Sequence, residues 1–393
     1  MNINTNPEKI EELLSRGVEE VISKDDLRKK LLTGKQLRVK LGIDPTSPNI
    51  HLGRSVPLLK LRDFQDLGHQ IVFIIGDFTG TIGDTSDKNA ERPMLDDATI
   101  KSNIKNYVAQ AAKVIDIDKC EVHYNNDWLG ALTYKEICKQ ANAFSINEFI
   151  SRDNIARRLE SGSRVSLREV LYPLMQGYDS VQLKADVEIG GTDQRFNLLA
   201  GRELQRLYGQ EPQNVITNPI IEGLDGRKMS SSWGNTVNLF DTPREMFGKI
   251  MSLQDEFIVK YFILVTRIDL GLVAEYKKEL DGGANPRDLK VKLAKEIVKM
   301  YHSEAEAEAE ELNFIKTFSK KEIPDEMPEI TPGAYDLISV LMEAKLATSK
   351  SDARRVIEQG GVKINQEVIK DINFIIPGGA VLQKGKINFL KVL

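Results

Sequence analysis

The stretch LRVKLGIDPTSPNIHLGRSVPLLKLRDFQDLGHQIVFIIGD, residues 37–77, decides the fold class of this chain. Its first seven residues alternate apolar with polar or small side chains, which predicts a strand over 37–43. Turn-forming residues follow at 44–48, and apolar positions at helical spacing then predict a helix that ends near Leu67. The unbroken apolar run at 71–75 is typical of a parallel strand covered on both faces. Strand, helix and strand form a βαβ unit, so we expect an α/β domain with a Rossmann-like parallel sheet.

The sequence pattern changes twice beyond this domain. Long helical stretches follow residue 240, and they include an alternating Glu-Ala segment that is typical of a solvated helix. Prolines then punctuate a polar stretch that we interpret as a linker, and a small separate unit ends the chain. The predicted division is a catalytic-type α/β domain at 1–240, a helical domain at 241–320, a linker at 321–334 and a small α+β domain at 335–393. Further strands are expected at 121–124, 186–189 and 215–221.

Length and composition indicate an ordinary globular protein. The 393 residues suffice for two or three domains, and 41% are apolar and 28% charged. The longest apolar runs are too short to span a bilayer and no signal-peptide pattern follows Met1, so we expect a cytoplasmic protein with no membrane partner. Cys120 and Cys138 are the only cysteines, too few for a disulfide framework or a four-thiolate zinc site. We expect free thiols and no protein-bound metal site.

The charge is distributed unevenly along the chain. The net charge is −4, which does not indicate a nucleic-acid-binding protein. Residues 335–393 nevertheless contain nine Lys or Arg and six Asp or Glu, a net charge of +3. A basic C-terminal unit on an acidic body favours contact with a polyanion, although a chance excess of three charges would give the same count.

Two short motifs lie about 180 residues apart. The first is Ile50-His51-Leu52-Gly53-Arg54, at the predicted start of the helix that follows the first strand. Backbone amides and the helix dipole at such a position suit an anion, and His51 could donate to a phosphate oxygen. The second motif, Lys228-Met229-Ser230-Ser231-Ser232, lies in a small-residue loop that nothing in the local sequence is expected to order. Such a loop could close on a ligand and bring an ammonium group with it.

Polar residues also follow the second strand of the βαβ unit. Asp84 comes after a glycine-rich segment at the carboxyl end of the run at 71–75, where ligands of parallel sheets bind. It could pair with an amino group, or be an ordinary loop aspartate. Lys88 and Arg92 lie just beyond and could close over a polyphosphate, although two cations four residues apart are usually only solvated surface.

A third group of polar residues lies in the middle of the chain. Tyr172, Gln176 and Asp179 are spaced so that they line one face of a helix, and half-buried polar groups of this kind need partners such as a polar ligand. Pro173 suits the first turn of that helix. A glycine turn then delivers two more polar side chains at the end of another expected strand. The sequence of that turn is Gly190-Gly191-Thr192-Asp193-Gln194.

Together, these motifs resemble those of the class I aminoacyl-tRNA synthetases, and over essentially the whole chain they are most similar to the bacterial tyrosyl-tRNA synthetase family. The resemblance implies an enzyme that joins tyrosine and ATP, with Mg²⁺, into tyrosyl-adenylate and then transfers tyrosine to tRNA(Tyr). It also implies a homodimer. By resemblance, Asp179 accepts the substrate phenol, while Asp84, Tyr172, Gln176 and Gln194 surround its ammonium and carboxylate groups. The implied catalytic residues are Thr46, His51, Lys88, Arg92 and Lys228. The implied ATP-binding residues are Gly42, Asp44, His51, Gly53, Arg54, Gly191, Asp193, Lys228, Met229, Ser230 and Ser231.

The chain departs from the family pattern at three positions. Arg54 stands where the first motif usually has a second histidine, and Ser231 where the second motif usually has a second lysine. Lys40 stands where many relatives carry a tyrosine that shares the substrate hydroxyl, so the second partner of the phenol is not evident. Two alternatives therefore stay open: a tryptophanyl-tRNA synthetase, and a catalytically inactive relative that binds RNA.

The C-terminal unit is similar to a small RNA-binding fold shared with a ribosomal protein. Ser349 is expected to cap a helix, from which Lys350, Arg354 and Arg355 would project toward backbone phosphate of tRNA. By the same resemblance, the helical domain would be of the anticodon-binding type.

Overall fold

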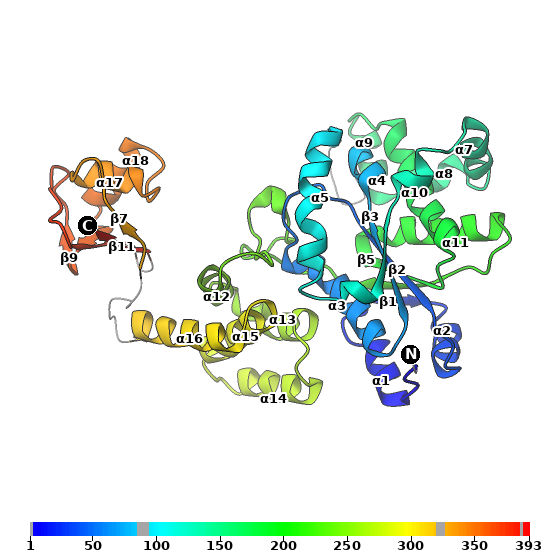
Figure 1. Cartoon of the computed structure of the whole chain (residues 1–393), viewed down its shortest axis with the longest axis horizontal. Coiled ribbons are helices and arrows are strands. Elements are labelled where there is room, and N and C mark those ends of the chain that lie inside the picture. Colours follow the sequence, from blue (N-terminus) through cyan, green and yellow to red (C-terminus); the bar gives the residue numbers. More distant parts are fainter. Residues whose placement is uncertain (1–2, 85–93, 320–326, 386–387) are drawn as a thin grey trace. The chain divides into compact units, whose positions relative to one another are not determined.

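The computed structural model of the chain describes residues 3–84, 94–319, 327–385 and 388–393. It divides into two compact units, residues 1–304 and residues 305–393 (Figure 1). Helices α12 to α15 belong to the first unit, so the predicted boundary at residue 240 does not separate the two units. The finer division into domains stays a prediction. Lys88 and Arg92 lie outside the described residues.

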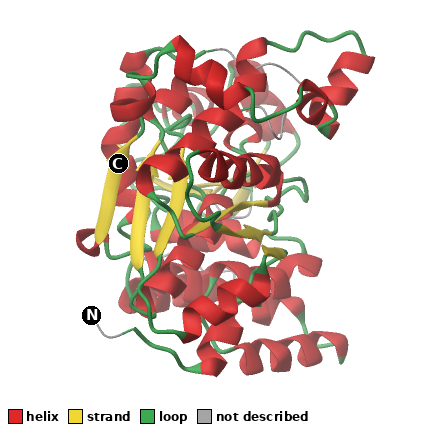
Figure 2. Ribbon diagram, turned by 90° about the vertical axis from the view of Figure 1, so that its right-hand side faces the viewer, coloured by secondary structure: helices red, strands yellow, loops and turns green. Residues whose placement is uncertain are grey.

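The first unit contains a six-stranded sheet in the order β1-β6-β5-β2-β3-β4, surrounded by helices (Figure 2). All neighbouring strands are parallel except β1, which runs antiparallel to β6. The strands are β1 (Glu20–Ile22), β2 (Arg38–Ile43), β3 (Gln70–Ile75), β4 (Cys120–Tyr124), β5 (Val187–Gly191) and β6 (Asn214–Asn218). This confirms the α/β fold class, and β4, β5 and β6 form where strands were expected.

Helix α3 (Leu52–Asp66) connects β2 to β3 and completes the predicted βαβ unit. Ile43 pairs with Ile75, so both strands end at the same level of the sheet. The chain order reverses between β2 and β5, since β3 and β4 lie on one side of β2 and β5 and β6 on the other. A crevice outside the carboxyl ends of strands at such a switch point is where open parallel sheets bind ligands.

Helix α10 (Leu167–Leu183) carries the polar face at 172–179 and lies against helix α11 (Arg195–Leu207). It begins six residues earlier than Pro173 indicated, because Ser166 and Glu169 form a capping box at its start. Pro173 therefore lies inside the helix, and its expected place in the first turn was wrong. At Gly177, a Cβ atom would come within 3.1 Å of the backbone of α11, so glycine is required for the two helices to approach this closely.

The remaining helices of the first unit flank the sheet, and α12 to α15 follow its last strand along the chain. They are α1 (Pro7–Leu13), α2 (Lys24–Leu32), α4 (Asp77–Ile82), α5 (Asp97–Ala111), α6 (Asn126–Leu129), α7 (Tyr134–Ala141), α8 (Ile146–Ile150), α9 (Asp153–Glu160), α12 (Pro243–Met251), α13 (Ile258–Val265), α14 (Leu270–Asp281) and α15 (Pro286–Tyr301). Among the described residues, no helix is both long and apolar enough to cross a membrane.

The second unit contains a five-stranded sheet in the order β7-β11-β10-β8-β9 and its own apolar core. Leu337, Leu341, Ile357 and Leu382 are fully buried in that core, which is what an independently packed unit requires. The Glu-Ala segment forms the start of helix α16, as expected, and is mostly exposed. The elements are α16 (Glu304–Ser319), β7 (Glu329–Ile330), α17 (Leu337–Glu343), α18 (Lys350–Glu358), β8 (Val362–Ile364), β9 (Glu367–Ile369), β10 (Val381–Lys384) and β11 (Asn388–Val392).

Candidate active site

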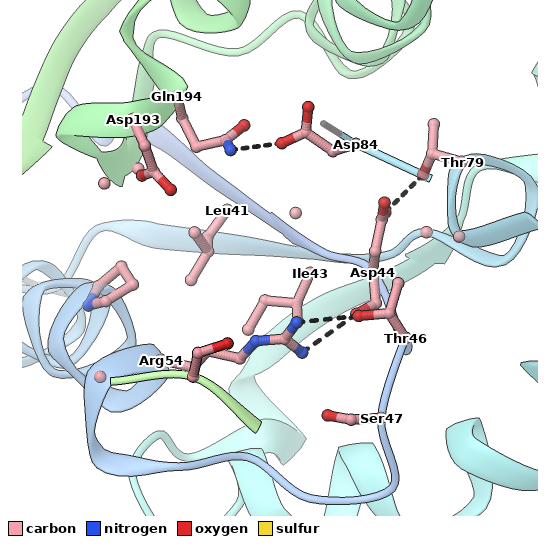
Figure 3. Close-up of a pocket in the computed structure, with 18 of the residues that line it drawn as sticks. Leu41, Ile43, Asp44, Thr46, Ser47, Arg54, Thr79, Asp84, Asp193 and Gln194 are labelled. Carbon is pink, nitrogen blue, oxygen red and sulfur yellow. Dashed lines mark hydrogen bonds between the residues drawn. The ribbon is translucent and has the colours of Figure 1, made fainter. Parts of the chain in front are cut away.

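A cavity of about 860 Å³ opens at the carboxyl ends of β2, β3 and β5, the position that the strand order indicates. Its volume is within the range of small-molecule binding sites. It brings together predicted residues from five separate segments of the chain, several of which Figure 3 shows pointing into one space. The predicted residues that line it are Gly42, Asp44, Thr46, His51, Gly53, Arg54, Asp84, Tyr172, Gln176, Asp179, Gly191, Asp193, Gln194, Lys228, Met229, Ser230 and Ser231.

Asp179 is a buried carboxylate at one end of this cavity, only 3% exposed. Trp128 donates its indole N–H to Asp179 Oδ1 at 2.8 Å, and Asn125 donates its amide to Oδ2 at 3.4 Å. Burial raises the pKa of Asp179 to about 7, because the charged form loses its hydration. The site is therefore a carboxylate with two fixed donors and room to accept one more hydrogen bond from a ligand.

The sequence argument did not identify Asn125 or Trp128. Asn125 directly follows strand β4, and Trp128 lies in α6, the short helix that comes next, at the carboxyl end of that strand. The rule that ligands gather at the carboxyl ends of parallel strands could have found them, had it been applied to β4 as it was to β3 and β5.

Lys40 does not line the cavity; its side chain is fully buried behind α10. Its ammonium nitrogen lies 2.9 Å from Glu188 and donates to the carbonyl oxygen of Gln176 and the hydroxyl of Ser180, at 2.9 and 2.7 Å. Because these three contacts occupy the donors of the ammonium group, Lys40 is not the missing partner of a ligand phenol. Asp179 is therefore the described side chain left to accept a hydrogen bond from a ligand phenol, and Trp128 holds that carboxylate in place.

The buried ion pair also fixes a predicted ligand-binding side chain. The amide nitrogen of Gln176 donates to Glu188 at 3.1 Å, so its amide oxygen is left as the acceptor for a ligand ammonium group. Nearby, Gln194 donates to Asp84 at 2.6 Å. A carboxylate and two amide groups thus line the same cavity, which suits a ligand with both an ammonium and a carboxylate.

Tyr172 and Asp44 form a second fixed pair in the cavity. The Tyr172 hydroxyl donates to Asp44 Oδ2 at 2.7 Å. Thr79 donates to the other carboxylate oxygen at 2.7 Å (Figure 3). Burial raises the pKa of Asp44 to about 6. Since Asp44 follows β2 directly, this pairing ties the first turn of the βαβ unit to the polar face of α10.

His51 precedes the first residue of α3 and is 7% exposed. Burial, with the nearby charges of Arg54 and Lys228, lowers the pKa of His51 to about 3, so the imidazole is neutral at pH 7. Its Nδ1 atom is buried and has no hydrogen-bond partner. A buried polar atom without a partner, at the edge of a cavity and at a helix start, indicates that a ligand supplies the partner.

The loop that carries Lys228 is docked on the cavity. Met229 is buried, and its sulfur accepts from the backbone N–H of Gly53, 3.2 Å away. The Lys228 ammonium lies 2.9 Å from the carboxylate of Asp193. The two motifs, 176 residues apart at this contact, therefore meet across the cavity as the resemblance implied.

The expectation that nothing local orders this loop was wrong. Asn235 accepts from the backbone N–H of Ser230 at 2.9 Å and donates to Asp225 and to the carbonyl of Lys228, at 2.7 and 3.1 Å. The Arg227 guanidinium also lies over the ring of Trp233, 4.6 Å from its centre. One asparagine thus closes the loop on itself, a side-chain-to-backbone role for which asparagine is well suited.

The predicted RNA-binding residues lie in the second unit. Ser349 caps α18 by accepting from the backbone N–H of Asp352, as expected. Lys350, Arg354 and Arg355 are all exposed on this helix, and Arg355 also pairs with Asp352 at 2.6 Å. Their exposure leaves them accessible to a polyanion.

Comparisons with known proteins agree with this geometry. The family described as "tRNA synthetases class I (W and Y)" matches residues 32–319, and the S4 domain family matches residues 337–382. The tyrosine–tRNA ligase of Moorella thermoacetica is 48% identical over 97% of this chain and 94% of its own, and that of Carboxydothermus hydrogenoformans 46% identical over 97% of each.

Solved structures give the same fold. A C-terminally truncated mitochondrial tyrosyl-tRNA synthetase of Coccidioides posadasii has a TM-score of 0.64 at 25% identity, over 77% of this chain and 91% of its own. The tyrosyl-tRNA synthetase of Archaeoglobus fulgidus, solved with L-tyrosine, has a TM-score of 0.63 at 24% identity, over 77% of this chain and 99% of its own.

Proposed function

Because the chain belongs to the class I tRNA synthetases, and within them to the tyrosine–tRNA ligases, we propose that it activates tyrosine with ATP and transfers it to tRNA(Tyr). The single observation that carries the choice of amino acid is the buried Asp179 with its two fixed donors. A phenol hydroxyl completes that site, whereas phenylalanine would leave the carboxylate without its partner. Tyrosyl-tRNA synthetases are a known example of discrimination by such a buried polar group.

The activation step needs no nucleophile from the protein. The carboxylate of tyrosine attacks the α-phosphate of ATP, tyrosyl-adenylate forms, and pyrophosphate leaves with the electron pair of the broken bond. Catalysis then rests on positioning and on stabilising negative charge that develops on the leaving group. We propose that Thr46, His51 and Lys228 stabilise this charge, together with Lys88 and Arg92, which lie outside the described residues. Asp193 and Gly191 are proposed to hold the ribose.

Mg²⁺ would enter with ATP and neutralise charge on the phosphates. Among the described residues, no group of three or more His, Cys, Asp or Glu side chains is arranged to hold a metal ion, so the phosphates themselves would supply most ligands. In the second step, a ribose hydroxyl at the end of tRNA attacks the tyrosyl carbonyl and AMP leaves. We propose that the second unit positions the tRNA through Lys350, Arg354 and Arg355.

A homodimer in the cytoplasm is also part of the proposal, on the strength of the family alone. The deciding experiment is ATP–pyrophosphate exchange with tyrosine, phenylalanine and tryptophan, followed by charging of tRNA. We expect exchange with tyrosine only. Exchange with tryptophan would establish the tryptophanyl alternative, and tRNA binding without exchange would establish an inactive RNA-binding relative.

A further inference from the structure

Arg54 is a cation of the cavity whose hydrogen bonds to described residues all go to neutral oxygens. Its guanidinium donates to the carbonyl of Asp44 at 3.2 Å and the hydroxyl of Thr46 at 3.1 Å (Figure 3). It also donates to the hydroxyl of Tyr107 at 2.6 Å. The buried carboxyl group of Asp44 interacts electrostatically with Arg54, but the guanidinium is bonded to the backbone carbonyl of Asp44 and not to its carboxylate. A half-buried cation that no carboxylate bonds directly is costly unless a ligand supplies the anion.

The surroundings of Arg54 are those of an anion site. Next to it are the hydroxyls of Thr46 and Ser47, the start of the 15-residue helix α3, and the buried, unpartnered Nδ1 of His51. The imidazole is uncharged, so Arg54 is the permanent positive charge at this end. Among the described residues that line the cavity, the other Lys or Arg is Lys228, which lies against Asp193.

Tyr107 sets the direction of the guanidinium. It lies on α5, is fully buried, and does not line the cavity. Arg54 Nη1 donates to the Tyr107 hydroxyl and to the carbonyl of Asp44, and Nη2 is therefore turned toward Thr46. Because Arg54 and both acceptors lie on regular elements or directly at their ends, this cation is placed before any ligand arrives.

Ser231 explains why a fixed cation matters in this chain. Its hydroxyl lies 3.4 Å from that of Ser47, so the loop reaches the same end of the cavity but brings no charge there. We propose that Arg54, held by Tyr107, is a permanent binding group for the phosphates of ATP and for departing pyrophosphate, and that it replaces a second loop ammonium. The inference rests on the proposed function, because it assigns these phosphates to ATP. Tyr107 is a positioning residue and Arg54 touches the ligand.

This placement has a kinetic consequence that differs from that of a mobile lysine. A cation that is in place before binding contacts the phosphates in the ground state and in the transition state, so its loss raises KM for ATP. That loss lowers kcat only by the part of the contact that strengthens as charge builds on the leaving group. Charge-assisted hydrogen bonds of this kind correspond to about a tenfold to hundredfold change in affinity.

The test compares Arg54→Met, Arg54→Lys, Tyr107→Phe and the double variant Arg54→Met/Ser231→Lys. Calorimetry gives the Kd of inorganic pyrophosphate with Mg²⁺, and exchange gives KM for ATP and for tyrosine. For Arg54→Met we expect the Kd of pyrophosphate and KM for ATP to rise about tenfold to a hundredfold, with KM for tyrosine unchanged. Arg54→Lys should give values between those of the wild type and Arg54→Met, and it serves as the test variant if Arg54→Met does not fold. Adding Ser231→Lys should recover part of the loss.

Tyr107→Phe should weaken pyrophosphate binding less than Arg54→Met, and should have no further effect once Arg54 is Met. The matched control is Tyr208→Phe, which removes a hydroxyl bonded to Glu136 outside the cavity. The proposal would be overturned if the Arg54 variants bound pyrophosphate as tightly as the wild type. It would also be overturned if Tyr107→Phe weakened pyrophosphate binding as much in Arg54→Met as it does in the wild type. Pyrophosphate binding needs no amino acid, so a wild type that binds it but does not use tyrosine would refute the proposed function and leave this inference standing.

Discussion

The ammonium nitrogen of Lys228 lies 2.9 Å from the carboxylate of Asp193, although the two residues are proposed to bind different parts of ATP. Lys228 is 29% exposed and Asp193 21%, so the pair is partly solvated and is not a strong structural contact. A ribose that bonds to Asp193 would compete with Lys228 for the same oxygens. Binding of the nucleoside would thereby release the ammonium toward the phosphates, and the loop would change partners without leaving a charge exposed.

Lys228→Ala should impair activation far more than it impairs binding of ATP or tyrosine. A contact that strengthens only as charge builds on the leaving group is worth about 2–4 kcal/mol, or roughly thirty- to a thousandfold in rate. Rapid-quench measurement of adenylate formation is the check. Lys249→Ala is the control, because that lysine pairs with Asp241 outside the cavity. A near-normal rate for Lys228→Ala would show that this loop does not contact the leaving group.

Asp179→Ala should reduce activation of tyrosine strongly and that of phenylalanine much less, since only tyrosine carries the hydroxyl. Loss of a hydrogen bond to a charged group is worth about 1.5–3 kcal/mol, roughly ten- to a hundredfold in kcat/KM. Trp128→Phe, which removes one donor to Asp179 but keeps the carboxylate, should have a smaller effect in the same direction. Equal losses with both amino acids would mean that Asp179 is structural.

Tyrosine binding should tighten as the pH rises from 6 to 8.5. Burial raises the pKa of Asp179 to about 7, so its carboxyl group is protonated below that pH and ionised above it. The ionised form accepts a stronger hydrogen bond from the phenol, which itself stays protonated until about pH 10. Equilibrium dialysis across this range is the measurement. Phenylalanine should show no such trend, and Asp179→Asn should abolish it; a trend shared by both amino acids would point to Asp44, whose pKa is raised to about 6.

The sequence predicts the fold and most of the cavity because those features are local. A strand, a helix and a strand within residues 37–77 define the parallel sheet, and motifs at the strand ends place their residues at one edge. The contacts that tune the site join distant residues instead: Trp128 and Asp179 are 51 positions apart, and Arg54 and Tyr107 53. No spacing pattern within a window of one helix or strand encodes such pairs.

The buried side chain of Lys40 is a second feature that the local sequence could not predict. Alternation over 37–43 predicts a strand with one polar face, and a lysine is rarely fully buried unless it is paired. In the structure its charge is compensated by Glu188 from β5, so both faces of β2 are covered. Residue type alone could not reveal that the partner lies 148 positions away, on a neighbouring strand.

Lys40→Met should destabilise the first unit by about 3–5 kcal/mol, because it leaves Glu188 buried without a counter-charge. The double variant Lys40→Met/Glu188→Gln should recover much of that loss. Urea unfolding followed by tryptophan fluorescence is suitable, since the chain's two tryptophans, Trp128 and Trp233, both lie in the first unit. KM for tyrosine should also rise, because the backbone carbonyl of Gln176 loses the hydrogen bond that it accepts from Lys40. A double variant no more stable than Lys40→Met would contradict this account of the ion pair.

Replacing Lys350, Arg354 and Arg355 together by Gln should lower tRNA charging while leaving tyrosine-dependent exchange unchanged, because these residues belong to a separately packed unit. Removing three phosphate contacts should also reduce the slope of log affinity for tRNA against log salt by about 2–3. Filter binding and charging over a salt series are the measurements. The control is Lys391→Gln, which removes one cation of the same unit that is already paired with Glu329. Charging that survives the triple replacement with an unchanged salt slope would show that α18 does not contact tRNA.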